Sequence, residues 1–505
     1  KKIAYADKML DRSIFATWSQ VKEMEQSGLV EIASHTHNLH NGINANPSGG
    51  QLPSVIAPEY KNGKYETEDA YKNRLKSDFA HTVQTLVNHI GKKPRVMVWP
   101  YGQFNDVAVQ LARQAGMPHY FSLGEKIVNK VGDKHIGRLL LNAETDLNTV
   151  KNYLDGIDES KQIQRVLHVD LDYVYDADKA QQAKNLDKLI DRIYRYGVTT
   201  VYLQAFSDPD GDGVADALYF PNKYLPVRDD IFGRIAWQLQ TRAGVQVYAW
   251  MPVLAFDLRK SVKEAEYVMD NRTGKPSTKA YLRLSPYNKQ NVEIIKSIYN
   301  DLSFYAKFNG ILFHDDAFLT DFEGAEGDHA EGMVSPQAKQ KTQDLIQLTH
   351  QLTDALKPYF LRGSYSLKTA RNLYASVITN PNAEEWLAQN LKTLTDNYDT
   401  TAIMAMPYME NEQPISQKEA YQWFASLIEN VKTQAPLDKV LFEFQAVNWR
   451  TQKPIPESEL INWMKLLQKN HIYSYGYYPD NFLTNQPDLN KMKPYFSVNT
   501  NVGKP

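Results

Sequence analysis

The chain has 505 residues, of which 42% are apolar and 23% charged, proportions typical of a soluble globular protein with about two or three domains. Lysine and arginine number 57 against 59 aspartates and glutamates, which argues against nucleic acid as a partner because that binding depends on excess positive charge. Cysteine is absent, which excludes disulfides, thiolate metal ligands and cysteine nucleophiles, and no apolar run is long enough for a membrane span.

Residues 1–150 alternate helical and extended patterns and predict an α/β unit that looks incomplete. The helix expected at 67–91 is the clearest element, because Thr67 is a good N-cap and Gly91 is a typical stop signal. The other expected elements are helices at 13–27 and 104–115 and strands at 29–34, 95–99 and from 119.

Three histidines fall within six residues directly after a short expected strand: His35, His37 and His40. Neutral imidazoles are the commonest metal ligands, and a catalytic metal would take two of them together with a carboxylate and a water. The alternative is a polar surface loop, and no obvious carboxylate partner precedes His35. Pro100 and Tyr101, in a turn after the strand at 95–99, could form a wall of such a site.

A polar stretch is expected to be a linker at 151–164, followed by a domain at 165–485 and a C-terminal tail at 486–505. Most strand candidates in the second domain are continuous apolar runs, as buried parallel strands should be. Eight strand–helix alternations over this length are typical of a (β/α)8 TIM barrel. The expected strands are Val166–Asp172, Thr199–Phe206, Gln246–Val253, Gly310–Asp315, Leu367–Asn372, Thr401–Met406, Lys439–Gln445 and Ile472–Tyr477.

Polar and aromatic residues gather where these strands end, which is where a barrel builds its active face. Since polar groups are costly inside a barrel without partners, this bias favours a substrate site over chance. The aromatic members could stack on sugar rings, although core packing is an equal alternative for each of them. The expected substrate-binding residues of the barrel are Asp170, Asp172, Gln204, Asp208, Trp250, His314, Lys368, Arg371, Tyr408, Glu443, Trp449, Tyr477 and Asp480.

Three carboxylates follow the fourth strand, at Asp315, Asp316 and Asp321. Glycoside hydrolysis needs one carboxylic acid to protonate the leaving oxygen and a second group to stabilise or attack the sugar cation. Neighbouring carboxylates raise one another's pKa and so keep one of them protonated. The three are therefore candidate catalytic residues, and the alternative is a capped, salt-bridged strand end.

The segment from Asp208 to Gly213 resembles the start of a calcium loop. Its twelfth position is Tyr219 and not the bidentate glutamate that such a loop requires. We therefore favour an ordered loop beside a sugar groove over a calcium site.

Several long segments resemble the bacterial poly-β-1,6-N-acetylglucosamine deacetylase family PgaB (HmsF), and the resemblance covers nearly the whole chain. They include VLHVDLDYVYD at 166–176, YLQAFSDPDGDG at 202–213, GILFHDDAFLTD at 310–321 and YGYYPDNFL at 475–483. The resemblance implies an α/β protein with a partial NodB-like polysaccharide deacetylase domain at 1–150 and a glycoside-hydrolase-like (β/α)8 barrel.

For the first domain, the resemblance implies a divalent metal (zinc, nickel, cobalt or iron) held by an Asp and two histidines, which correspond to His35 and His40. Pro100 and Tyr101 correspond to the substrate-groove motif. The paired Asp residues and a general-acid His of the family precede the histidine motif. We therefore expect this chain to lack them and not to be a competent deacetylase.

For the barrel, the resemblance implies binding of partly deacetylated polymer, with cleavage in some members and no cofactor. The catalytic acid corresponds to Asp321, with Asp315 and Asp316 as neighbouring contacts. An intact acetamido group of the substrate could itself act as nucleophile. The alternative is a barrel that only guides polymer to the outer-membrane export porin.

The resemblance also implies a periplasmic protein associated with the outer membrane, whose lipid anchor is absent from this sequence. Its expected partners are poly-β-1,6-N-acetyl-D-glucosamine, the partly deacetylated polymer and the export porin. We expect a monomer and no nucleic acid.

Overall fold

The computed structural model describes residues 2–5, 8–123, 128–143, 145–155, 163–324, 334–363 and 366–499. The chain divides into two compact units, one formed by 1–157 together with 361–366 and the other by 158–360 together with 367–505. The expected linker at 151–164 lies partly outside the described residues.

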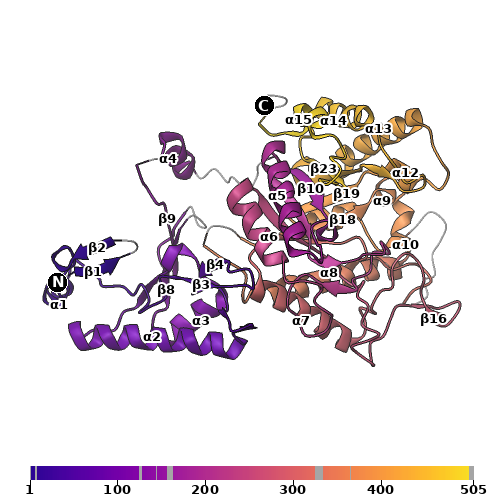
Figure 1. Ribbon diagram of the computed structural model, residues 1–505. Helices are drawn as coiled ribbons and strands as arrows, with labels where there is room; N and C mark the ends of the chain where they lie inside the picture. The colour runs from indigo at the N-terminus through magenta and orange to yellow at the C-terminus, as the bar shows by residue number, and fades with distance from the viewer. Residues whose placement is uncertain are drawn as a thin grey trace. The chain divides into compact units, whose positions relative to one another are not determined.

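The first unit is built on a parallel sheet in the order β7-β8-β9. Strands β8 and β9 are labelled in Figure 1. The core of this unit contains the buried side chains of Tyr71, Phe79, Trp99 and Phe104. Its strands and helices are β1 (Lys2–Tyr5), β2 (Lys8–Asp11), α1 (Trp18–Gln26), β3 (Gly42–Asn44), β4 (Gln51–Pro53), β5 (Tyr60–Lys61), β6 (Lys64–Tyr65), α2 (Glu68–Ile90), β7 (Val96–Val98), α3 (Asp106–Gln114), β8 (His119–Leu123), β9 (His135–Arg138) and α4 (Leu147–Leu154).

The expected helix at 67–91 is confirmed as α2. The Thr67 hydroxyl accepts the Ala70 N–H at 3.2 Å, and Gly91 ends the helix with φ 76°. The expected strand at 29–34 is wrong, because only Ser34 pairs with the sheet, through a single parallel bridge to Met97. Leu29 is 91% exposed, so its apolar character contributes nothing to a core.

A short segment from the second half of the sequence completes the first unit. Arg362 and Phe104 exchange two backbone hydrogen bonds, at 2.8 and 3.1 Å. The Arg362 guanidinium also lies 2.8 Å from the Asp106 carboxylate at the start of α3. Nothing in the local sequence pattern of 361–366 predicted this membership.

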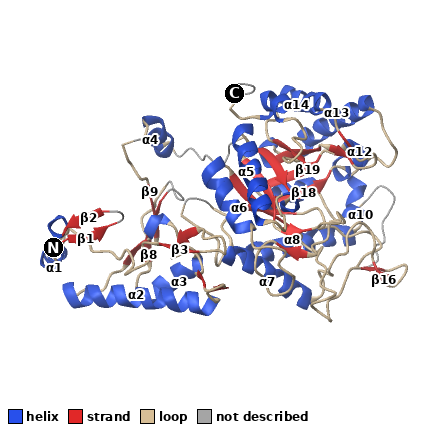
Figure 2. Ribbon diagram, viewed as in Figure 1, coloured by secondary structure: helices blue, strands red, loops and turns tan. Residues whose placement is uncertain are grey.

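The second unit contains a closed barrel of eight parallel strands, which confirms the predicted fold class. Each strand pairs with the next along the chain, and the last pairs with the first. Figure 2 shows these strands surrounded by helices. The barrel strands are β10 (Arg165–Val169), β11 (Thr200–Gln204), β14 (Gln246–Met251), β17 (Gly310–Phe313), β18 (Lys368–Tyr374), β19 (Thr400–Met404), β20 (Val440–Gln445) and β23 (Tyr475–Tyr478).

The helices of this unit cover the outside of the barrel, and short antiparallel pairs decorate the loops. Helices α5 and α8 lie where the sequence pattern predicted helices. In the described part of the chain, no helix combines the length and apolar character needed to cross a bilayer. The helices are α5 (Lys179–Tyr196), α6 (Phe232–Gln238), α7 (Lys289–Tyr305), α8 (Pro336–Leu356), α9 (Ser376–Thr379), α10 (Glu384–Leu387), α11 (Leu391–Asn397), α12 (Pro407–Glu410), α13 (Gln417–Gln434), α14 (Glu457–Lys469) and α15 (Leu489–Phe496). The short strands are β12 (Phe206–Ser207), β13 (Ala217–Leu218), β15 (Met269–Asp270), β16 (Lys275–Pro276), β21 (Val447–Asn448) and β22 (Lys453–Pro454).

The expected tail at 486–505 contains α15, which packs against α5 and α14. Phe496 is fully buried, and its ring lies 5.3 Å from that of Tyr477 in β23. The described part of this segment therefore belongs to the barrel unit.

Candidate functional site

The histidine loop of the first unit is held by the sheet and by α2. Ser34 exchanges backbone hydrogen bonds with β7 at 2.9 and 2.8 Å, so the loop leaves the sheet at a defined point. The Asp78 carboxylate on α2 accepts the N–H groups of His37 and Asn38 at 2.9 and 2.6 Å. These bonds hold the loop in shape while the imidazoles stay exposed.

His35 and His40 converge within this loop. His35 Nδ1 lies 2.7 Å from the Val98 carbonyl, which can only accept, so in the neutral ring Nε2 carries the free lone pair. This Nε2 lies 3.1 Å from His40 Nδ1. Burial and the neighbouring His35 lower the pKa of His40, which favours the neutral form that binds metals. His37 turns away and stacks on His81, with 5.5 Å between ring centroids.

The two converging nitrogens fit two positions of a metal shell. The contact between His35 Nδ1 and the Val98 carbonyl also fits, because metal-binding histidines usually donate the other ring N–H to a carbonyl or carboxylate. Among the described residues, no carboxylate completes a three-ligand group with them. Of the two expected wall residues, Tyr101 lies beside His40 at 4.5 Å between ring centroids, whereas Pro100 is buried.

At the barrel mouth, Asp172 is the centre of a dense hydrogen-bonded cluster. Its carboxylate accepts from the hydroxyls of Tyr219 and Ser207 at 2.5 and 3.1 Å, and from the Arg228 guanidinium at 2.5 Å. It also accepts the Asp208 N–H at 2.9 Å. Asp172 therefore joins the loops after β10 and β11, and sequence reasoning did not identify Tyr219 or Arg228 as its partners.

Asp316 and Glu443 were expected to act on substrate, and the structure commits both to the protein instead. Asp316 is fully buried and accepts the backbone N–H groups of residues 253–255 at 2.6 to 3.1 Å. Glu443 accepts from His168 Nε2 and Asn372 Nδ2, both at 2.7 Å. Since these partners occupy both oxygens of each carboxylate, Asp316 anchors the loop after β14 and Glu443 ties three strands together.

Asp315 forms a charged pair with His314. Its Oδ1 lies 2.8 Å from His314 Nε2, and its Oδ2 accepts from the hydroxyls of Tyr281 and Tyr374 at 2.9 and 2.7 Å. Burial disfavours the imidazolium, but the carboxylates beside it outweigh burial and raise the pKa of His314 to about 10. Burial alone would raise the pKa of Asp315, but His314 and the two hydroxyls lower it. Asp315 is therefore a fixed anion, and both tyrosines are site residues that the sequence patterns missed.

Asp170 is the buried carboxylate with the least support at the barrel mouth. Its Oδ2 lies 3.4 Å from the Tyr478 hydroxyl, and its Oδ1 has no hydrogen-bond partner in the described structure. Burial, followed by the charge of Asp172, raises the pKa of Asp170 to about 7. The Trp250 ring lies 5.4 Å from that of Tyr478, and its buried indole N–H is also unpartnered among the described residues. Buried polar atoms without partners mark places where water or a ligand hydroxyl can bind.

Asp321 lies on a tight turn after β17, closed by a Glu323 N–H to Thr320 carbonyl bond of 3.1 Å. Asp321 is half-buried, and the neighbouring Phe322 is 42% exposed. Unlike Asp316, Asp321 therefore reaches solvent.

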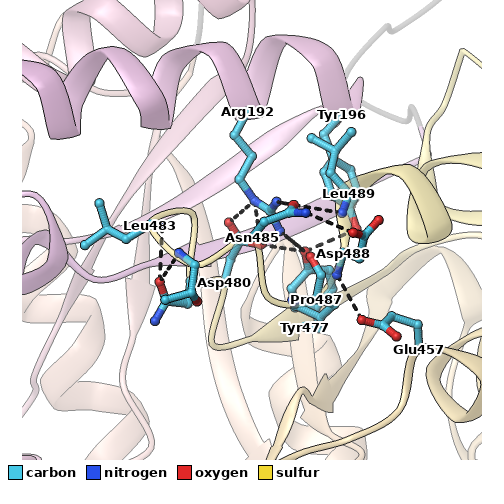
Figure 3. A network of polar contacts seen from close by, with 12 residues as sticks. Arg192, Tyr196, Glu457, Tyr477, Asp480, Leu483, Asn485, Pro487, Asp488 and Leu489 are labelled. Carbon is cyan, nitrogen blue, oxygen red and sulfur yellow. Dashed lines mark hydrogen bonds and ion pairs between the residues drawn. The ribbon is translucent and has the colours of Figure 1, made fainter.

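Tyr477 and Asp480 were expected to bind substrate, but the structure places both in contacts within the protein, and both are fully buried. Figure 3 shows Arg192 of α5 reaching Asp480, with 2.6 Å between Nη2 and Oδ1. The Tyr477 hydroxyl donates to the same carboxylate at 2.6 Å. These residues fasten α5 to the loop after β23.

Lys368 and Arg371 also lie outside the mouth. Lys368 begins β18, at the opposite end of the strand from the active face, and its ammonium lies 3.6 Å from the Asp399 carboxylate. Arg371 is fully buried and donates to the Tyr398 hydroxyl at 2.8 Å and to the Ala317 carbonyl at 2.9 Å. Successive side chains of a strand point to opposite faces, so Arg371 turns outward where Asn372 turns inward.

Three further expected residues have partners within the barrel unit. Tyr408 bonds to Glu459, and the Gln204 side chain faces the Asp172 N–H at 3.5 Å. Trp449 is half-exposed and stacks on Tyr478 with 6.1 Å between ring centroids.

The segment from Asp208 to Gly213, which resembles the start of a calcium loop, is organised by its own first carboxylate. Asp208 accepts the N–H groups of Asp212 and Gly213 at 3.1 and 2.9 Å. Burial raises the pKa of Asp208 to about 6. The carboxylates of Asp208, Asp210 and Asp212 do gather within 4.8 Å. However, the twelfth position is Tyr219, whose hydroxyl donates to Asp172. We therefore still favour an ordered loop over a calcium site.

Comparison with known proteins matches both units. The family model "Hypothetical glycosyl hydrolase family 13" matches residues 168–478, and "Polysaccharide deacetylase" matches residues 5–120. A poly-beta-1,6-N-acetyl-D-glucosamine N-deacetylase of Escherichia coli (strain K12) is 39% identical over 524 aligned residues, covering 99% of this chain and 77% of that protein. A protein of the same name from Staphylococcus aureus (strain N315) is 28% identical over 141 residues, covering 28% of this chain and 42% of that protein.

A solved structure also matches the barrel. The glycoside hydrolase domain of PgaB (BpsB) from Bordetella bronchiseptica aligns with a TM-score of 0.61 and 39% identity, covering 67% of this chain and all of that domain. The converging histidines and the acidic barrel mouth thus lie in units that match a deacetylase and a glycoside hydrolase respectively. This chain belongs to the PgaB family of poly-β-1,6-N-acetyl-D-glucosamine N-deacetylases, with a polysaccharide deacetylase unit followed by a glycoside-hydrolase-like barrel.

Proposed function

We propose that this protein processes poly-β-1,6-N-acetyl-D-glucosamine of biofilms by two hydrolytic reactions. The deacetylase unit, to which this sequence contributes the two histidine ligands, serves the removal of acetyl groups, and the barrel binds the partly deacetylated polymer and cuts it internally. The observation that carries the proposal is the pairing, in one chain, of converging histidines with an acidic barrel mouth that matches a whole PgaB hydrolase domain.

In the first unit, His35 and His40 would hold a divalent ion, with zinc, nickel, cobalt and iron as the candidates. Such an ion, when bound, polarises the acetamide carbonyl and makes its bound water more acidic. The chain's own contribution is orientation: the Val98 carbonyl fixes the His35 ring, and Tyr101 forms a wall beside His40. Elemental analysis of the protein and of His35→Ala tests this assignment.

In the barrel, charge selects the substrate and a carboxylic acid acts on it. Deacetylation exposes ammonium groups, and the exposed carboxylates of Asp210 and Asp212 attract them. The charge of Asp315, in contrast, is already balanced by His314. Asp321 reaches solvent and is the proposed general acid, which protonates the glycosidic oxygen as the bond breaks. An intact acetamido group of the substrate can supply the nucleophile, so a second free carboxylate is not required.

The family resemblance also supports a periplasmic location with attachment to the outer membrane. The export porin of the same system is the proposed protein partner, and we propose that the chain is a monomer. Cell fractionation and co-purification with the porin test these assignments.

The decisive experiment is mass spectrometry of partly deacetylated β-1,6-glucosamine oligomers after incubation with the native chain and with Asp321→Asn. Shorter oligomers with the native chain alone support hydrolysis with Asp321 as the acid. Intact oligomers with both proteins, together with retained binding, would replace hydrolysis with the alternative of a polymer-guiding barrel.

A further inference from the structure

We propose that the buried ion pair between Arg283 and Glu323 positions the turn that carries Asp321 against the fixed anion Asp315. Both are positioning residues, since their side chains are 0% and 1% exposed and reach the proposed acid only through neighbouring groups. The inference rests on the proposed role of Asp321 in the barrel.

The side chain of Glu323 closes the turn that contains Asp321. Its Oε2 accepts the Thr320 N–H at 2.9 Å, and its backbone N–H donates to the Thr320 carbonyl at 3.1 Å. Asp321 lies between these two residues, so the position of its carboxylate depends on that closure. The Lys341 ammonium also donates to the Thr320 carbonyl, at 2.9 Å.

Glu323 Oε1 connects this turn to a second loop, the segment 277–283. It accepts from Arg283 Nη2 at 2.5 Å and from the Ser277 hydroxyl. Arg283 also donates to the Phe318 carbonyl, and its guanidinium lies 4.0 Å from the centre of the Phe318 ring. The ion pair thus fastens both ends of 318–323 to the second loop.

The second loop carries Tyr281, which touches the fixed anion directly. The Tyr281 hydroxyl donates to Asp315 Oδ2 at 2.9 Å, and its ring lies 5.5 Å from that of His314. Arg283 Nε lies 3.4 Å from the Tyr281 carbonyl. The buried ion pair therefore fixes the position of Asp321 relative to Tyr281, which donates its hydroxyl to Asp315.

A buried charged pair suits this task, because a shift of one loop relative to the other would separate the two charges. Each charge would then be buried without compensation, which is costly, so the two loops keep their relative position. Misplacing a catalytic group by about 1 Å can cost a factor of about 100 in rate. Binding of a long polymer across the whole mouth depends much less on one turn. The expected signature is a loss in kcat with little change in KM.

The test is Glu323→Gln in the full chain, which keeps the shape of the side chain and removes its charge. We expect kcat for oligomer cleavage to fall about 10- to 100-fold, with KM within about threefold of the native value. Hydrogen exchange measured by mass spectrometry should become faster in the peptide that contains residues 318–323. Ser277→Ala removes one donor to Glu323 and is the milder variant if Glu323→Gln does not fold, with a smaller change in the same direction.

Lys307→Met is the matched control. Lys307 is also a buried basic side chain of the barrel, but it lies before β17, at the far end of that strand, and donates to backbone carbonyls, including that of Ser303 at 2.7 Å. It should lose stability without the change in kcat or in exchange at 318–323. Native kcat and native exchange in Glu323→Gln would overturn the proposal, as would equal losses in Lys307→Met. If the native chain cleaves nothing, the hydrolase assignment fails by itself, and the exchange measurement still decides the positioning role.

Discussion

The histidine loop of the first unit and the acidic mouth of the barrel use their polar groups in opposite ways. In the loop, His35 and His40 are exposed, and one nitrogen of each faces the other with little else bound to it. In the mouth, several carboxylates are buried and already hold backbone or side-chain donors, as Asp316 and Glu443 do. A ligand residue in an exposed loop is therefore recognisable from its spacing, whereas the role of a buried carboxylate depends on which other groups fill its lone pairs.

The sharpest way to test this difference is to remove the carboxylate that reaches solvent. Asp321→Asn should lower cleavage of partly deacetylated oligomers by a factor of about 10² to 10⁴, because it removes the proposed proton donor and no structural bond. Polymer binding, measured by calorimetry, should persist. Cleavage at the native rate by Asp321→Asn would transfer the acid's role to another group.

Substitution of a carboxylate that already accepts backbone hydrogen bonds should lower the free energy of unfolding of the barrel. Asp316→Ala leaves three buried backbone N–H groups without an acceptor, so the barrel should lose about 3 to 5 kcal/mol in unfolding free energy. Asp321→Ala is the matched control, with an expected change below about 1 kcal/mol. Denaturant unfolding of the two variants measures this, and similar losses in both would contradict the division into committed and open carboxylates.

In the exposed loop, a change of ligand should affect metal binding and leave the fold intact. His35→Ala and His40→Ala should each weaken binding of a divalent ion by at least about tenfold. His37→Ala is the control from the same loop, because His37 stacks on His81 and takes no part in the converging pair. Equal metal content in all three variants, measured by elemental analysis, would remove the ligand assignment.

The smallest expected effect is a pH dependence from Asp170. Its folded-state pKa of about 7 lies above its ordinary value, so folding favours the protonated form. The stability it contributes is present below the ordinary pKa of about 4 and is lost as the pH rises through about 7.

The side chain at position 170 cannot ionise in Asp170→Asn. The melting temperature of the barrel should therefore fall by roughly a few degrees less between pH 5 and pH 8 in this variant than in the native chain. Glu410, whose pKa burial also raises to about 7, remains in both proteins and provides the common background. An identical pH profile in the native chain and the variant would show that Asp170 ionises normally.

The barrel was predictable because its eight strands are nearly continuous apolar runs and the helices between them follow one period. The helix α2 was predictable from Thr67 and Gly91, which act within a few residues of one another. The neighbours of the site residues were not predictable in this way, because Tyr281 reaches Asp315 from a loop and Tyr374 reaches it from the end of β18. Arg192 was also not predictable as a partner of Asp480, because the two residues are far apart in the sequence. Their ion pair gives Asp480 a structural role, whereas a substrate contact was expected. Neighbouring positions such as Arg371 and Asn372 were indistinguishable until the direction of each side chain in β18 was known.

The membership of residues 361–366 in the first unit has a consequence for the order of events during synthesis. The backbone pairing of Arg362 with Phe104, and its ion pair with Asp106, join two stretches of chain that are made far apart in time. A ribosome makes the first unit's sheet early but supplies Arg362 only after most of the chain has emerged. Domains usually fold one after another from the N-terminus. Here the last contacts of the first unit can form only after residues 361–366 have been synthesised. By that time, half of the barrel strands have already been translated.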